Sequence, residues 1–151
     1  MKILRLYIDN FLCYDKSLID FTTFNAALVL GKKENNDMFA NGVGKTTIFK
    51  AIEYALFNQS DVNFEELIRD DTNMCKVILD FAEGEHEYRI SRSRTLKGAS
   101  DVTILRRNLI PGEFNEVYFD SLSPITNNKY WVDLSGRRSA DTEKEIVKLI
   151  K

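Results

Sequence analysis

The stretch "NGVGKTT" at residues 41–47 constrains the fold most, because it joins two contrasting patterns. Residues 26–31, "AALVLG", precede it and form a short, continuously apolar run that is typical of a strand buried on both faces. The residues that follow recur at helical spacing: Ile48, Ala51, Ile52, Ala55 and Leu56. A buried strand, a glycine-rich loop and a helix in this order predict a phosphate-binding loop in an α/β fold.

The residue types in this loop suit phosphate chemistry. Gly42 and Gly44 let backbone N–H groups turn inward without a Cβ clash, and the positive end of the following helix dipole adds to their attraction for phosphate oxygens. Lys45 would reach the β and γ phosphates, and the Thr46 hydroxyl would ligate Mg²⁺. The predicted nucleotide-binding residues are Gly31, Asn41, Gly42, Val43, Gly44, Lys45, Thr46 and Thr47.

The usual phosphate-loop pattern places its first glycine where this chain has Phe39. Gly31 ends the apolar run, so we interpret it as the opening glycine and residues 32–39, "KKENNDMF", as an insertion. Lengthening a loop in this way costs only about 1 kcal/mol of closure entropy. The polar insertion either bulges into solvent or folds over the nucleotide, and the sequence leaves both open.

Alternating apolar residues predict strands at residues 2–9, 17–21 and 101–107, and a hairpin at residues 75–93 with Gly84 in its turn. Weaker strand patterns occur at residues 117–119 and 130–132, and Pro111 with Gly112 indicates a turn. Residues 63–68 suggest a short helix with Asn63 and Glu66 as its capping pair. A last helix is expected to have Asp141 or Thr142 as its cap and to bury Ile146, Leu149 and Ile150.

Length and composition fit one domain of ordinary size, with 151 residues and 44% hydrophobic residues. The net charge of −2 gives no overall electrostatic case for nucleic acid. Cys13 and Cys75 lack metal-site spacing, so both are expected to be reduced, buried thiols. No apolar run has the length of a membrane span, and the sequence predicts a cytoplasmic protein without a membrane partner.

The order of these motifs resembles the N-terminal lobe of the SMC-like ATPases, including the SbcC-type double-strand-break repair ATPases and their relatives RecN and RecF. The resemblance rests first on "MKILRLYIDNF" followed by "NGVGKTTIFKAIEYALF". The later segments "FEELIRDDTNMCKVILDFAEGEHEYRISRSRT" and "WVDLSGRRSADTEKEIVKLI" are similar to the family in order and character. The resemblance implies a mixed β-sheet with the phosphate-loop helix packed on it, plus an antiparallel β portion.

This resemblance also implies a function. Residues 1–151 would form the single N-terminal lobe of a split ATPase head that binds ATP and Mg²⁺, and the coiled coil and C-lobe would lie outside this chain. Two complete heads would enclose two ATP molecules, with DNA and a nuclease subunit as partners, in repair, recombination, chromosome organisation or anti-phage defence. The isolated lobe is expected to bind nucleotide weakly and to hydrolyse it poorly. In such lobes the residues after the first strand, here residues 10–14, often lie near the nucleotide.

Two other interpretations remain open. A small stand-alone kinase or GTPase would need its acidic Mg²⁺ partner within this chain, and Asp80 in "VILDFAE" is the main candidate. A non-enzymatic interaction module would use the nucleotide only for regulation. Independently of these, Arg92, Arg94 and Arg106 would contact DNA phosphates if they share an accessible sheet face.

Overall fold

A computed structural model describes residues 1–30, 44–108 and 131–150 with their side chains. For the short strands at residues 32–33, 36–39, 119–120 and 123–124 it describes the backbone alone. The strands of the main sheet are β1 (Lys2–Phe11), β2 (Tyr14–Asp20), β5 (Met74–Glu83), β6 (His86–Thr95), β7 (Ser100–Asn108) and β10 (Val132–Asp133). The helices are α1 (Lys45–Phe57) and α2 (Ser139–Ile150), with a 3-10 turn, η1 (Phe21–Thr23), after β2.

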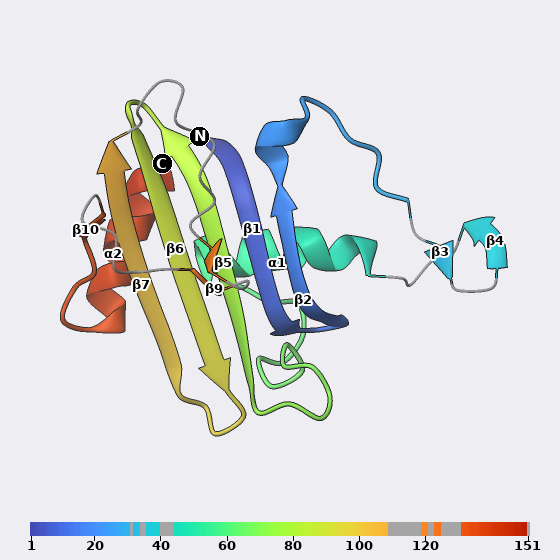
Figure 1. The fold of residues 1–151 in the computed structure, drawn as a ribbon. Helices are drawn as coiled ribbons and strands as arrows, with labels where there is room; N and C mark the ends of the chain where they lie inside the picture. Colours follow the sequence, from blue (N-terminus) through green and yellow to red (C-terminus); the bar gives the residue numbers. More distant parts are fainter. Residues whose placement is uncertain are drawn as a thin grey trace.

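The six strands form one sheet in the order β10-β7-β6-β5-β1-β2, and every pairing is antiparallel. Both helices pack on the same face of this sheet and lie behind it in the view of Figure 1. The β1–β2, β5–β6 and β6–β7 pairs are hairpins, whereas β1 and β5 are joined through α1. The sheet therefore places the start of α1 beside the turn between β1 and β2.

The hydrophobic core lies between the helices and the sheet. Alternate side chains of each central strand point to this face, so that Leu79 of β5 and Ile90 of β6 are fully buried. Ala51 and Ala55 of α1 and Ile146 of α2 cover them from the other side. The expected stripe of α1 is therefore largely confirmed, although Ile48 and Ile52 are only partly buried. The helix ends at Phe57, and the C-cap residue Asn58 still donates its N–H to the Tyr54 carbonyl at 3.0 Å before its left-handed backbone (φ 52°) turns the chain away.

The opposite face of the sheet carries buried charges that neutralise one another. Arg89 on β6 donates two hydrogen bonds of 2.7 Å to the carboxylate of Asp80 on β5. Arg5 on β1 lies 3.6 Å from Asp80 and 3.2 Å from Glu87. Arg107 also binds Glu87, and the ring of Trp131 lies 4.9 Å from the guanidinium carbons of both Arg89 and Arg107. Such pairing is required because an unpaired buried charge is strongly destabilising.

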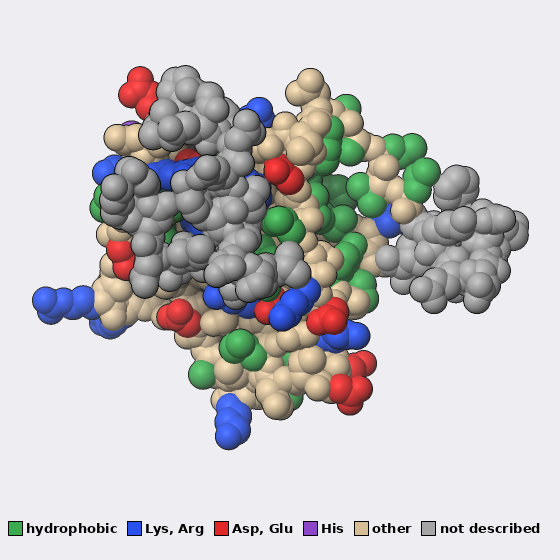
Figure 2. Space-filling view, in the orientation of Figure 1, with side chains coloured by type: hydrophobic (Ala, Val, Ile, Leu, Met, Phe, Trp, Pro, Cys, Tyr) green, Lys and Arg blue, Asp and Glu red, His purple; other side chains and the backbone are tan. Residues whose placement is uncertain are grey.

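The structure confirms the strands expected at residues 2–9, 17–21 and 101–107, the hairpin at residues 75–93 and the helix after Gly44. The central strand expected at residues 26–31 is wrong. Residues 26–30 form no strand and are exposed, with 82% of the Leu28 side chain accessible, and Gly31 lies outside the described residues. In Figure 2 hydrophobic side chains gather on the right of the view, on the side of the molecule where this segment runs.

The reason is that no described strand pairs with this segment on either side. Its edge strand β2 pairs with β1 on one side, and no described strand pairs with its other side. An apolar run needs strands on both sides to become a central strand, and residues 26–30 have none. The main sheet is therefore antiparallel throughout, and the described residues do not form the mixed sheet that we expected.

The short helix expected at residues 63–68 is instead a turn. Asn63 and Glu66 do bond through their side chains at 2.8 Å. Ile68, however, pairs with Phe11 in an isolated bridge, and this tertiary contact draws the chain away from a helical path. Phe64 and Leu67 still turn apolar side chains toward the core cluster.

The last helix begins at Ser139, before the predicted Asp141 or Thr142. The backbone N–H groups of both predicted caps already bond to the Arg138 carbonyl. Thr142 is buried, and its hydroxyl accepts a hydrogen bond from the Gly136 N–H at 3.0 Å, so it fastens the preceding loop instead of capping the helix. Ile146 is fully buried as predicted.

The insertion contains two short strands, β3 (Lys32–Lys33) and β4 (Asn36–Phe39), that pair antiparallel. This pair of strands forms a small sheet of its own that stands apart from the main sheet (Figure 1). A second small pair is β8 (Phe119–Asp120) with β9 (Ser123–Pro124). Of the weaker predictions, Pro111 and Gly112 lie outside the described residues. Among the described helices, neither has the length and apolar character needed to cross a membrane.

Candidate nucleotide-binding site

The N-terminus of α1 has the backbone expected of a phosphate-loop helix. Gly44 is its N-cap residue and is left-handed, with φ 84° and ψ 7°. An L-residue with a side chain rarely adopts this conformation, so glycine is required here. Gly44 also offers no side chain to cap the helix, and the first N–H groups of a helix have no acceptor within it. These N–H groups and the positive end of the helix dipole favour an anion at this end of a helix.

The three residues that open α1 differ in exposure in a way that fits their predicted roles. Thr46 is exposed, Lys45 is partly buried, and Thr47 is 7% exposed. The Thr47 N–H bonds to the Gly44 carbonyl at 3.1 Å, so this residue shapes the turn itself. The exposed Thr46 hydroxyl suits a Mg²⁺ ligand, because Mg²⁺ at phosphate sites takes few protein ligands and shares the phosphate oxygens. The described residues contain no cluster of three or more His, Cys, Asp or Glu side chains that could hold a metal by themselves.

The rest of the predicted loop cannot be placed. Gly31, Asn41, Gly42 and Val43 lie outside the described residues, so their contacts with phosphate stay predictions. The described part of the predicted site is therefore Gly44 to Thr47, together with the residues that pack against the start of α1.

The turn between β1 and β2 packs against this helix start. The Cys13 Sγ lies 3.5 Å from the Thr47 Oγ1. It also faces Gly44 so closely that a Cβ added there would be 2.5 Å from the sulfur and 3.3 Å from the Tyr14 ring. Burial raises the pKa of Tyr14 above its usual value. Cys13 and Tyr14 therefore lie beside the start of α1, and proximity of residues 10–14 to a nucleotide stays a prediction. Cys13 is exposed, contrary to its predicted burial.

The same turn is held in an unusual backbone conformation. Asn10 and Leu12 both have positive φ angles, of 49° and 51°. Two backbone hydrogen bonds stabilise it, from Leu12 N to Leu67 O at 2.8 Å and from Arg69 N to Asn10 O at 2.9 Å. Backbone strain of this kind persists only where the surroundings determine it, and it concentrates at functional sites. The turn at residues 63–68 therefore supports the turn that contacts Gly44.

Asp80 does not serve as the acidic Mg²⁺ partner that the kinase or GTPase interpretation needs. Its side chain is 1% exposed, and both carboxylate oxygens are bound by Arg89. Asp80 alternates with Leu79 and Phe81, which point to the helix face, so its side chain lies on the other face of the sheet from α1. Its resemblance to an acidic metal-binding strand comes from the apolar residues of a central antiparallel strand.

The three arginines proposed as DNA contacts share one face of the sheet, but that face is the one covered by the helices. Arg92 is 2% exposed, and α1 and α2 bind its guanidinium, so a role in DNA contact is wrong for this residue. Arg94 is partly buried, with its guanidinium carbon 4.2 Å from the centre of the Phe64 ring. Arg106 is also partly buried. DNA contact by Arg94 or Arg106 stays a prediction.

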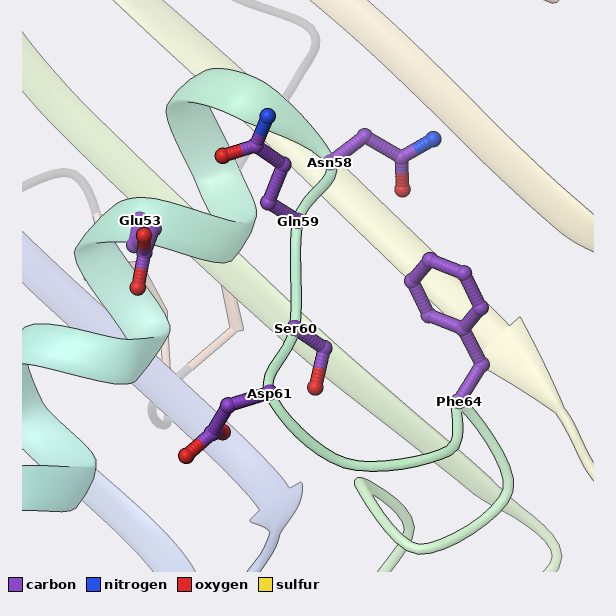
Figure 3. Close-up of a pocket in the computed structure, with 6 residues that line it drawn as sticks. All are labelled: Glu53, Asn58, Gln59, Ser60, Asp61 and Phe64. Carbon is purple, nitrogen blue, oxygen red and sulfur yellow. The ribbon is translucent and has the colours of Figure 1, made fainter.

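A shallow pocket of about 450 Å³ lies at the other end of α1. Its lining residues are Glu53, Asn58, Gln59, Ser60, Asp61 and Phe64 (Figure 3). Asp61 pairs with Lys50 of α1 at 2.9 Å, and Ser60 accepts a hydrogen bond from the Val62 N–H. These contacts hold the loop after the helix, and none of the lining residues belongs to the predicted nucleotide site.

The sequence analysis gave two residues of this region other roles than the structure does: Cys13 was expected to be a buried thiol, and Arg92 a DNA contact. Cys13 contacts Gly44 and Thr47 only because the sheet brings a distant turn to the helix start, and no local pattern shows that contact. The sequence does contain a signal for the burial of Arg92. This residue follows Tyr88 and Ile90 at alternate positions of a strand, so its side chain faces the core. A charged residue at such a place indicates a buried polar partner.

A helix that begins at a left-handed glycine and packs on a β-sheet is the arrangement expected of an α/β fold of the phosphate-loop class. Residues 5–149 match the AAA_23 family, whose description is an AAA domain. The chain belongs to this family, and the resemblance to the SMC-like and RecF-type DNA repair ATPases is confirmed.

Curated relatives include the DNA double-strand break repair Rad50 ATPases of two archaea. The protein from Thermoplasma acidophilum is 34% identical over 96 residues, which cover 63% of this chain and 10% of the relative. The protein from Thermoplasma volcanium is 33% identical over 101 residues, covering 66% of this chain and 10% of the relative. The chain thus spans about a tenth of the length of these relatives.

Solved structures of the recombination mediator protein RecF in its RecFOR pathway share the fold. The structure described as RecF-ATP has a TM-score of 0.52 and 16% sequence identity, covering 68% of this chain and 26% of RecF. A second RecF structure, described as RecF-ATPrS, has the same TM-score and 17% identity. At this level of identity the likeness concerns the fold.

Proposed function

We propose that this chain binds ATP and Mg²⁺ as the N-terminal lobe of an SMC-like, SbcC-type ATPase head that acts in DNA repair, recombination or genome defence. The observation that carries the proposal is the left-handed Gly44 at the start of α1, in a chain of the AAA_23 family. Backbone N–H groups of residues 42–47 hold the phosphates, and Lys45 neutralises their charge. The exposed Thr46 hydroxyl supplies a ligand to the Mg²⁺ that accompanies ATP.

Exposed apolar surface beside this site supports the need for a second lobe. Leu28, Val29 and Leu30 are exposed in the segment that leads to the loop, and Phe49 and Phe57 are exposed on α1. An apolar surface of this kind marks an interface. We propose that a C-lobe covers it, pairs its own strands with residues 26–30, and supplies the acidic and water-positioning residues. The isolated chain would then bind ATP and hydrolyse it poorly.

The complete heads would form a homodimer around two ATP molecules, with DNA and a nuclease subunit as partners. This part of the proposal rests on the family, since the Rad50 relatives are named for DNA double-strand break repair. The charges of the described residues add little to it, because the basic side chain at Arg92 is buried and bound.

Binding of a fluorescent ATP analogue in the presence of Mg²⁺ tests the nucleotide site. We expect Lys45→Ala to weaken binding at least roughly tenfold, because a phosphate loses its main charge partner. Lys50→Ala is the matched control, since Lys50 lies in the same helix and pairs with Asp61 in the distal loop. If Lys45→Ala and Lys50→Ala both bind the analogue like the unchanged chain, the phosphate-loop proposal is wrong.

Steady-state turnover tests the split head. We expect the chain alone to show little hydrolysis, and no loss of ATP affinity on Leu28→Ser, since Leu28 is 82% exposed. Robust turnover by the monomeric chain would show that its catalytic residues are already present, and would defeat the split-head proposal.

A further inference from the structure

One buried side chain, Arg92, joins the phosphate-loop helix to the second helix. Its Nε donates a 2.7 Å hydrogen bond to the Ala55 carbonyl in the last turn of α1. Its Nη1 and Nη2 donate to the two carboxylate oxygens of Glu143 in α2, at 2.5 and 2.7 Å. Arg92 is 2% exposed and Glu143 is 29% exposed, so these bonds are largely shielded from water.

The bond to Ala55 lies at the electrostatically favourable end of α1. The last carbonyls of a helix have no partner within it, and they carry the negative end of the helix dipole. A buried arginine is suited to this position because its planar group donates several hydrogen bonds in fixed directions. Arg92 thus caps α1 from a strand, at the opposite end from Gly44.

The two ends of α1 are mechanically connected. Ala55 lies about 15 Å from Lys45 along a continuous helix, at 1.5 Å per residue. At the first end, Gly44 is in close contact with Cys13, so a small sliding or tilting of α1 changes that contact. At the other end, the bonds made by Arg92 fix the helix against β6 and α2.

We infer that Arg92 is a positioning residue for the phosphate loop: it fixes α1 relative to the sheet and couples the position of Gly44 to that of α2. The inference rests on the proposed function, because it takes the N-terminus of α1 as the nucleotide site. Glu143 is the partner of Arg92 on α2, and any rearrangement of α2 would change the position of the phosphate loop through this ion pair.

The test compares variants of the full chain by three measurements. These are affinity for the fluorescent ATP analogue with Mg²⁺, the hydrogen-exchange rate of the Thr47 amide, and stability to urea. The variants are Arg92→Met, Arg92→Lys and Glu143→Gln. Leu105→Ala is the control for lost stability, because Leu105 is buried on the face of the sheet away from the helices. All binding is measured where urea curves show each variant to be folded.

We expect Arg92→Met to weaken ATP affinity on the order of tenfold, as is typical of coupling between sites, and to speed exchange of the Thr47 amide. Arg92→Lys should recover part of the loss, because a lysine can reach Ala55 or Glu143 but cannot make the forked bond. Glu143→Gln keeps the bond to Ala55 and should have the smaller effect. Leu105→Ala should lower stability while leaving affinity and Thr47 exchange unchanged.

Two results would overturn the inference. One is that Arg92→Met leaves both affinity and Thr47 exchange at the values of the unchanged chain. The other is that Leu105→Ala, at equal loss of stability, changes them as much, which would make Arg92 merely structural. If the unchanged chain fails to bind ATP at all, the proposed function is wrong. The comparison of Thr47 exchange rates then tests by itself whether Arg92 fixes the position of α1.

Discussion

The thiol of Cys13 lies against the α-carbon face of Gly44, so close that no side chain fits between them. The two residues belong to different parts of the fold, the turn after β1 and the cap of α1. Their contact means that the glycine is required for two independent reasons, its left-handed φ angle and the sulfur beside it.

Gly44→Ala should therefore lower stability as well as nucleotide binding. The left-handed backbone alone costs a non-glycine residue about 1–2 kcal/mol, and the 2.5 Å approach to Cys13 adds to it. Cys13→Ala removes the sulfur, so the double variant should be less destabilised than the sum of the two single variants, by about 0.5–1 kcal/mol. Urea unfolding measures all three. Strict additivity would show that the sulfur does not obstruct position 44.

The two cysteines should differ sharply in reactivity. Cys13 is exposed, whereas Cys75 is 1% exposed and burial raises its pKa to about 11. N-ethylmaleimide should label Cys13 first, as mass spectrometry can show, because the thiolate is the reacting form. Mg²⁺ and ATP should slow this labelling, since bound phosphates would lie beside Gly44.

A Cys13→Ser variant, which should lose the fast label, is the control for the assignment. An unchanged labelling rate at saturating ATP would contradict the placement of the phosphates next to the β1–β2 turn.

Asp80→Asn should be among the most destabilising single changes in the sheet. It leaves Arg89 and Arg5 without their shared counter-charge in a buried position, which typically costs about 3–5 kcal/mol. At a temperature where the variant stays folded, its affinity for Mg²⁺ and ATP should equal that of the unchanged chain. A variant that stays stable but loses only its Mg²⁺-dependent affinity would revive Asp80 as a metal ligand.

Cys75 predicts a loss of stability at alkaline pH. Burial raises its pKa from 9.0 to about 11, so the folded chain keeps the thiol proton that the unfolded chain loses above pH 9. The stabilisation is fully present below pH 9 and disappears as the pH rises to 11, a fall of up to roughly 2 kcal/mol. Tyr54, whose pKa burial raises to about 12, acts in the same direction from pH 10 upward.

Cys75→Val should flatten the stability curve between pH 9 and 10, where Tyr54 contributes little. Urea midpoints at three pH values in this interval would measure the change. A slope that persists in the valine variant would assign the alkaline loss to another group.

Local patterns predicted those elements that depend on local contacts. The hairpin of β5 and β6 could be predicted from its alternation and from Gly84 in its turn, because a hairpin brings together residues that are close in the chain. The start of α1 was readable because Gly44 and Lys45 form a motif with its own chemistry. These features predicted the α/β class of the fold and the start of α1, whereas the phosphate contacts of the site stay predictions.

The predictions are wrong where contacts between residues distant in the sequence determine the local structure. Residues 26–30 have the composition of a buried strand, but the described chain contains no strand to pair with them. Arg92 looked like a surface charge, and only the packing of α1 and α2 onto β6 reveals its partners. Asn63 and Glu66 bond as a capping pair would, yet the bridge between Phe11 and Ile68 makes the segment a turn.

The pairing of β1 with β5 also has a consequence for how the chain folds. The β1–β2 hairpin and the β5–β6–β7 meander can each form from neighbouring residues, but their union must close a long loop that contains α1 and the β3–β4 hairpin. Contacts between such distant residues form slowly, although lengthening the loop further changes their cost little. Lengthening the chain between β2 and α1 therefore adds little to the cost of folding, so the stretch that contains the phosphate loop can accept an insertion such as the β3–β4 hairpin.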